Sequence, residues 1–129
     1  MRMTKSIRQA AKSIVIQSAG ISTVFTSRVT NIDINQVPLI MVYFDEGSVG
    51  IKGMEGQETD AGLIIEIVAK ANTDLDDALD ELAEQVETLL KASGQLGGLV
   101  NVLSQTGFSY NRDDNSPLGT IALNYRVNF

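Results

Sequence analysis

The sequence contains no cysteine and no histidine. Without thiolate or imidazole groups, the chain lacks the usual ligands of zinc sites and the base of a Ser-His or Cys-His catalytic pair. Disulfide bonds are excluded as well, and a chain of this length needs neither a disulfide nor a metal to fold. A metal site built from carboxylates alone stays possible.

Long apolar runs are also missing. No stretch approaches the roughly 20 apolar residues of a membrane span, and the N-terminus lacks the apolar core of a signal peptide. We therefore expect a soluble protein that is made in a cytoplasm and has no membrane partner. At 129 residues the chain is expected to form one domain, 1–129.

The charges are unevenly distributed. The net charge of -6 argues against a specific nucleic-acid partner, because such binding needs Lys and Arg to neutralise phosphates. Residues 1–32 carry Lys and Arg but no acid, whereas residues 74–87 carry Asp and Glu but no base. Two interpretations stay open: two solvated faces of opposite sign, or a head-to-tail contact in which the basic end of one copy meets the acidic segment of the next.

Residues 62–93 form the centre of the predicted fold. Alternation of apolar side chains over 63–70 predicts a half-buried strand. After Ala71 the apolar spacing changes to three and four residues, which predicts an amphipathic helix with Thr73 as its N-cap and Gly94 as its stop. The apolar stripe of this helix consists of Leu75, Ala78, Leu79, Leu82, Val86, Leu89 and Leu90.

The other elements complete an α+β fold. We predict a helix over 4–19, a short strand over 22–27, irregular chain over 31–36, a weak helical stripe over 96–103 and two closing strands that meet at a turn over 111–119. Residues 39–44 are all apolar and predict a strand covered on both faces, for which a neighbouring subunit is one candidate cover. The expected architecture is a single mainly antiparallel or mixed sheet with both main helices packed on one face.

Residues 45–62 differ from their surroundings because glycines alternate with charged and polar residues. This composition cannot bury much apolar area, so we predict a long mobile hairpin arm. The segment has no G-x-G-x-x-G motif and no P-loop spacing, and no helix follows it, which argues against phosphate binding.

One compact group of residues has side chains suited to catalysis or metal binding: Arg112, Asp113 and Asp114. Paired carboxylates can share a proton or hold Mg²⁺. A turn, or a salt bridge within or between subunits, is the favoured interpretation, since no general base with a pKa near neutrality accompanies the pair. We predict no cofactor, no bound metal and no enzymatic activity; a Mg²⁺-dependent enzyme is the weakest alternative.

The closing stretch resembles the C-terminal end of the minor tail protein U family of long-tailed bacteriophages. The resemblance rests on residues 107–114, Gly-Phe-Ser-Tyr-Asn-Arg-Asp-Asp, and residues 121–127, Ile-Ala-Leu-Asn-Tyr-Arg-Val. The segments before them follow the family order, although the N-terminus is more basic and the arm richer in glycine than expected. The resemblance implies a tail terminator: a hexameric ring that caps the tail tube, stops its polymerisation and offers the surface for head joining.

The resemblance also implies partners and a location. The partners are other copies of the chain, the tail tube protein and a head-completion protein, and the location is the virion tail after assembly in a bacterial cytoplasm. The candidate subunit-interface residues are Arg8, Lys12, Tyr43, Asp77, Asp80, Glu84, Arg112, Asp113 and Asp114. The candidate tube-docking residues of the arm are Gly47, Ile51, Lys52, Met54 and Glu55. The alternative from another class is a small-ligand-binding or regulatory α+β domain.

Overall fold

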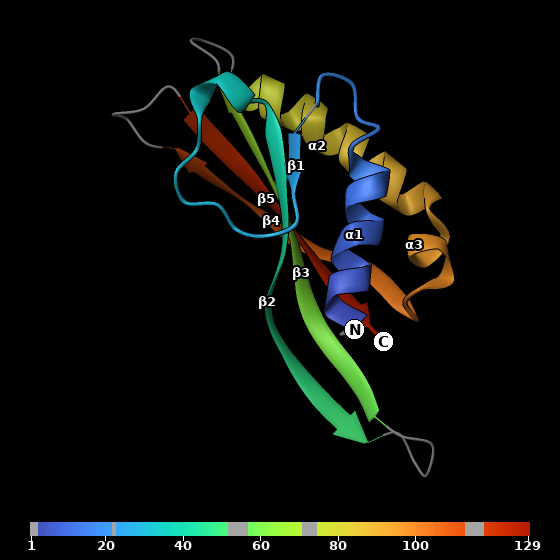
Figure 1. The fold of residues 1–129 in the computed structure, drawn as a ribbon. Helices are drawn as coiled ribbons and strands as arrows, with labels where there is room; N and C mark the ends of the chain where they lie inside the picture. The colour runs from blue at the N-terminus through green and yellow to red at the C-terminus, as the bar shows by residue number, and fades with distance from the viewer. Residues whose placement is uncertain (1–2, 22, 52–56, 71–74, 113–117) are drawn as a thin grey trace.

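The computed structural model describes residues 3–21, 23–51, 57–70, 75–112 and 118–129. The chain forms helices and a sheet of mostly long strands (Figure 1). In chain order the elements are α1 (Met3–Val15), β1 (Thr23–Phe25), the 3₁₀ turn η1 (Ile34–Gln36), β2 (Leu39–Ile51), β3 (Gln57–Lys70), α2 (Leu75–Ala92), α3 (Gly94–Gly98), β4 (Val102–Arg112) and β5 (Leu118–Asn128).

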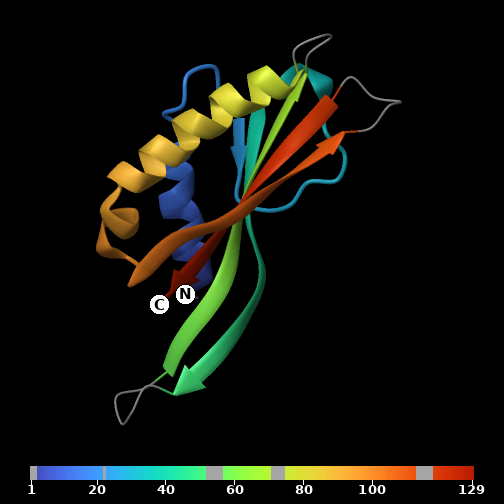
Figure 2. The same ribbon diagram turned by 180° about the vertical axis from the view of Figure 1, so that it is seen from behind.

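The strands form one mixed sheet in the order β1-β2-β3-β5-β4. β1 is parallel to β2, and every other neighbouring pair is antiparallel. The predicted mixed or mainly antiparallel sheet is therefore confirmed. β2 is bulged between Phe44 and Gly47, and β4 between Gln105 and Gly107. Bulges increase local twist, and Figure 2 shows the strands crossing in a strongly twisted fan.

Both main helices pack on the same face of the sheet, as predicted (Figures 1 and 2). Their apolar stripes meet the inward-facing residues of β2, β3 and β5, and Ile7, Ile65 and Leu79 are fully buried there. The second of the two predicted closing strands is confirmed as β5, and its alternate residues Ile121, Leu123, Tyr125 and Val127 all join this core. Burial of these apolar side chains is the main source of stability in such a two-layer domain.

The opposite face of the sheet is partly covered by the chain's own connection between β1 and β2. Val29, Ile32 and Val37 of that connection pack against a small cluster made by Leu39, Met41 and Val68. The strand over 39–44 is thus covered on both faces at its start, as expected, but both covers come from the same chain. A second subunit is not the cover at Leu39 and Met41, because both are buried in the single chain.

Several element ends differ from the sequence prediction. α1 ends at Val15 and not at Ala19, because the bonds from Gln17 and Ser18 reach back only three residues and tighten the chain into turns. The proposed cap Thr73 lies outside the described residues. The helical stripe over 96–103 is wrong as predicted: Leu103 belongs to β4, and Gln95 and Leu96 have positive φ in a left-handed turn.

β2 and β3 continue past the rest of the sheet as a two-stranded ribbon (Figure 1). Their pairing runs from Gly47 opposite Ala61 to Ile51 opposite Gln57. The sheet's last connection to this ribbon is the pair of bonds between Thr59 and Phe129, with N···O distances of 2.6 and 2.9 Å. The described parts of 45–62 are therefore strands, interrupted by the bulge before Gly47, and the mobility of the arm stays a prediction.

Candidate assembly surfaces

The basic and acidic segments occupy different places across the sheet. α1 contacts β1 and β2, whereas α2 contacts β3 and β5, so the two helices lie side by side from one edge of the sheet toward the other. Lys12 is exposed on α1, and Asp77, Asp80 and Glu84 are exposed on α2. The charge separation seen in the sequence is therefore a separation in space.

Two predicted interface residues are held by contacts within the chain. The half-buried Arg8 donates from its Nη1 to the carbonyl of Thr26 at 2.7 Å, which ties α1 to the segment after β1. The half-buried Tyr43 donates from its hydroxyl to Glu66 Oε1 at 2.6 Å across β2 and β3. Burial, and then the hydrogen bond to Glu66, raise the pKa of Tyr43 well above its usual value, so this phenol stays protonated.

Arg112 contacts α2. Its Nε and Nη2 donate to the two carboxylate oxygens of Asp76, each at 2.7 Å. This bidentate pair joins the end of β4 to the first turn of α2. The sequence prediction placed Arg112 with Asp113 and Asp114, and both of these lie outside the described residues, so their role at the hairpin or between subunits stays a proposal.

An exposed aromatic pair lies beside this ion pair on β4. Phe108 and Tyr110 meet edge to face with ring centroids 5.8 Å apart, and the Arg112 guanidinium lies 5.1 Å from the centroid of the Tyr110 ring. The Tyr110 hydroxyl donates to Asp80 on α2, and this bond raises the pKa of Tyr110. Phe108 remains 61% exposed although it is held from one side.

Phe108 and Tyr110 were not among the site residues predicted from the sequence, which predicted only a closing strand at this place. β4 is the edge strand, and α2 lies over β3 and β5. β4 therefore extends beyond the area that α2 covers, and the rings of Phe108 and Tyr110 lie at the margin of the sheet. How far the helices cover the sheet depends on the tertiary arrangement.

The arm residues are described only in part. Gly47 lies at the root of the ribbon, where its backbone approaches Asp60 and Ala61, and Ile51 ends β2. Lys52, Met54 and Glu55 lie outside the described residues. Val49 faces solvent on the ribbon with 62% of its surface exposed.

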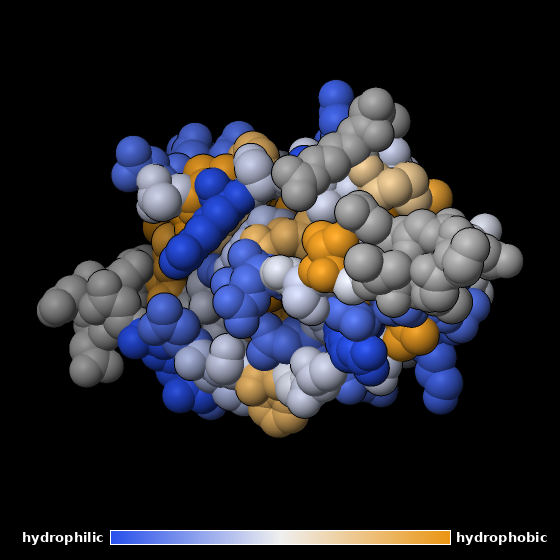
Figure 3. Space-filling view, turned by 90° about the horizontal axis from the view of Figure 1, so that it is seen from below, coloured by the Kyte–Doolittle hydropathy of each residue, from blue (hydrophilic) through white to orange (hydrophobic). Residues whose placement is uncertain are grey.

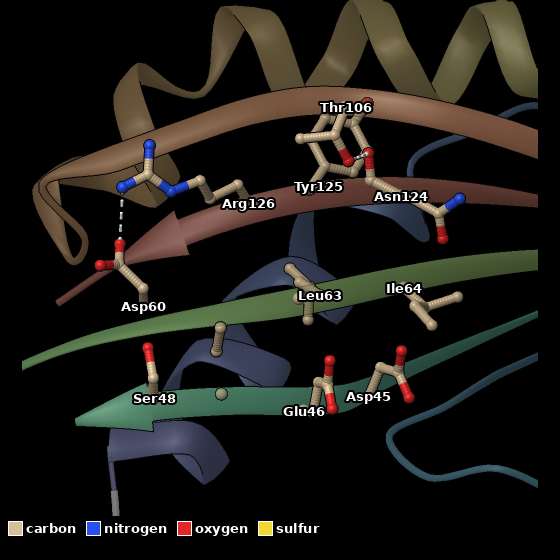
Figure 4. Close-up of a pocket in the computed structure, with 13 residues that line it drawn as sticks. Asp45, Glu46, Ser48, Asp60, Leu63, Ile64, Thr106, Asn124, Tyr125 and Arg126 are labelled. Carbon is tan, nitrogen blue, oxygen red and sulfur yellow. Dashed lines mark hydrogen bonds and ion pairs between the residues drawn. The ribbon is translucent and has the colours of Figure 1, made fainter.

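A shallow hollow lies on the polar face of the sheet, near the bulges (Figure 4). Asp45 and Glu46 line it from β2, and Asn124 and Arg126 from β5. Arg126 pairs with Asp60 at 2.9 Å. The hydrogen bond from Asn128, together with Arg126, lowers the pKa of Asp60. These contacts join β3 to β5 at the base of the arm.

The part of the chain that the structure describes contains no group of three or more Asp or Glu side chains placed to hold a metal ion. None of its helices is long and apolar enough to cross a membrane. Figure 3, a view from below, shows hydrophobic residues in separate patches among polar ones.

Comparison with known proteins shows a similar fold and a matching family. The fold is similar to that of a chain in the virion of a native gene transfer agent (GTA) particle, with a TM-score of 0.51 and 9% sequence identity over 97% of this chain and 92% of that chain. No curated protein matches the sequence. The model of the family described as phage minor tail protein U matches residues 2–129. The chain belongs to this family and is a structural protein of a phage tail.

Proposed function

We propose that the protein is the tail terminator: a ring of six copies that caps the finished tail tube, stops its polymerisation and provides the surface for head joining. The observation that carries the proposal is the match of the family model to residues 2–129. The number six and the terminating role come from the family resemblance.

The placement of charge supports a ring. A closed ring needs two different, complementary patches on each copy, so that each contact is head to tail. α1 is basic and lies toward the β1 edge, and α2 is acidic and lies toward the β4 edge. Complementary charges at the two edges orient such an encounter, although partly exposed pairs add only ~0–1 kcal/mol each.

The ribbon supports the contact with the tube. It projects from the domain at the end away from the start of α2, and it carries the exposed Val49 (Figure 1). A projecting hairpin can reach the tail tube without disturbing the packing of its own domain. We assign tube docking to the arm, and head joining to another face of the ring. The net charge of -6 would keep DNA from adhering as it passes through the ring.

A tube-length assay tests this function. In one variant, residues 50–58 are replaced by Asn-Gly, which closes a two-residue hairpin between Val49 and Thr59 and keeps the Thr59–Phe129 bonds. The tube protein is polymerised in vitro with the wild-type protein or with the variant. We expect the wild type to limit tube length and the variant to form rings that no longer stop growth.

Two outcomes would change the assignment. Tubes of normal length with the shortened variant would refute arm docking. Loss of rings in the shortened variant, with its thermal melt unchanged, would move the arm to the subunit interface.

A further inference from the structure

The edge of the sheet at β4 has the properties of a surface that binds another protein. β4 is an edge strand of 11 residues. Long edge strands in soluble proteins are usually protected by charge, proline or a covering element. Residues 102–111 contain no Lys, Arg, Asp, Glu or Pro, and most of their side chains are exposed. The protective features of this strand are the bulge after Gln105 and the charge of Arg112 at its end.

A groove runs between this strand and α2. Ala83, Ile121 and Leu123 supply its apolar lining, and Phe108 stands on the β4 side. Asp80, Glu84 and Glu87 supply the carboxylates on the α2 side. The groove thus combines an apolar floor with an acidic wall, and its ligand should be an apolar surface that carries positive charge.

Phe108 is held in place before any ligand arrives. Its ring meets the Tyr110 ring edge to face, and Tyr110 is fixed by the hydrogen bond to Asp80 and by the Arg112 guanidinium over its ring. Arg112 is in turn fixed by Asp76. An aromatic side chain that is exposed and already ordered loses little entropy on binding, which is the usual property of an interface anchor.

The complement of this groove lies on the same chain. α1 exposes Lys12, and Ile16, the first residue after α1, lies four residues further on and is 40% exposed. The amide of Ile16 still bonds to the Lys12 carbonyl at 3.0 Å, so the two residues keep helical spacing. Lys5 adds a second exposed cation two turns before Lys12, about 10 Å away along the axis.

The spacing of charge agrees on both sides. Asp80 and Glu87 are also seven residues apart, with Glu84 between them, so the acidic wall repeats over the same two helical turns. We propose that the groove between α2 and β4 of one copy receives the exposed face of α1 of the next, with Ile16 and the Lys12 stem against Phe108. This inference rests on the proposed ring, and it adds the anchor and the groove that close each contact.

Because the chain has no cysteine, a cross-linking test has no background. Lys12→Cys and Glu84→Cys are purified separately, mixed at the concentration at which the wild type assembles, and oxidised. We expect a disulfide-linked dimer in the mixture and little in either variant alone. Dimers of Glu84→Cys with itself would indicate a two-fold contact and overturn the proposal, as would the absence of any mixed dimer from assembled rings.

A second experiment tests whether Phe108 anchors the contact. Phe108→Ser should weaken subunit association by roughly 30-fold or more in native mass spectrometry, the effect of a central anchor residue. Ile16→Ser should weaken it as well, and the double variant should fall short of the product of the two effects. Val49→Ser is the matched control, because Val49 is equally exposed on the arm, and its rings should stay intact.

The two proposals fail differently. Six-fold rings that associate equally tightly in the wild type and in Phe108→Ser would overturn the groove contact and leave the terminator role standing. A wild type that forms no ring, alone or with tube protein, would overturn the terminator role and the groove contact together. A circular-dichroism melt of Phe108→Ser, expected to match the wild type, separates lost association from lost folding.

Discussion

Arg112 donates hydrogen bonds to both carboxylate oxygens of Asp76, each at 2.7 Å, and this contact joins the end of the edge strand β4 to the start of the acidic helix α2. The two residues are 36 positions apart in the chain. The same guanidinium lies over the ring of Tyr110. One side chain therefore connects α2, β4 and the aromatic pair at the margin of the sheet.

The Arg112–Asp76 pair should contribute little to the stability of the isolated chain. Both side chains are about half exposed, at 49% and 54%, so solvent screens their attraction. In a double-mutant cycle of Arg112→Ala and Asp76→Ala, we expect a coupling free energy of ~1 kcal/mol or less. Urea unfolding of the four proteins measures it, and a coupling above ~2 kcal/mol would contradict this account of an exposed pair.

The two glycines of β2 should respond differently to a methyl group. A Cβ on Gly47 would lie 2.9 Å from the Asp60 carbonyl oxygen and 3.0 Å from the Ala61 Cβ, so the backbone of the ribbon must shift. A Cβ on Gly50 would meet its nearest atom at 3.9 Å, an ordinary contact. We expect Gly47→Ala to lower the free energy of unfolding by ~1–3 kcal/mol and Gly50→Ala to change it little.

Thermal melts of the two alanine variants make the comparison directly. Equal melting temperatures would show that the root of the arm is not tightly packed at Gly47.

Alkaline pH should destabilise the fold through Tyr125. Burial, and then the charge of Glu87, raise the pKa of Tyr125 from 10.0 to about 12. Between these values the unfolded chain loses the proton while the folded chain keeps it. The free energy of unfolding therefore falls with rising pH above about 10, by up to ~1.4 kcal/mol per pH unit for this group.

Tyr125→Phe checks the assignment. Melting temperatures measured from pH 8 to pH 12 should fall less steeply in this variant than in the wild type above pH 10. Parallel curves for the two proteins would show that other groups cause the loss of stability at alkaline pH. Tyr43 is the first candidate because its pKa is raised as well.

Salt should loosen the rings only modestly. The charges assigned to the contact, among them Lys12 and Glu84, are exposed, and each exposed pair adds little that salt can remove. Apolar contact at Phe108 and Ile16 should provide most of the association. Native mass spectra, or light scattering, between 0.05 and 0.5 M salt at one protein concentration measure this, and complete dissociation across that range would show that charge dominates.

The sequence was sufficient for the parts of the fold in which one face is buried. Alternation over 121–129 and the three- and four-residue steps over 75–90 predicted β5 and α2, because burial of one face imposes those periods. The helical N-terminus and the placement of both helices on one face also followed from these patterns.

Features that depend on distant contacts were not predicted. The cover of Leu39 and Met41 comes from a polar connection, in which the packing residues Val29, Ile32 and Val37 have no regular spacing. The partner of Arg112 was sought among its neighbours, Asp113 and Asp114, and Asp76 lies in another element. The exposure of Phe108 depends on how far the helix layer extends over the sheet, which no local pattern encodes.

The central claim is tested most directly by electron microscopy of the purified protein mixed with its tail tube protein. The account predicts six-fold rings at one end of each tube and a narrow distribution of tube lengths, both absent when the protein is left out. Tubes that keep growing in its presence, with no ring at their ends, would contradict it.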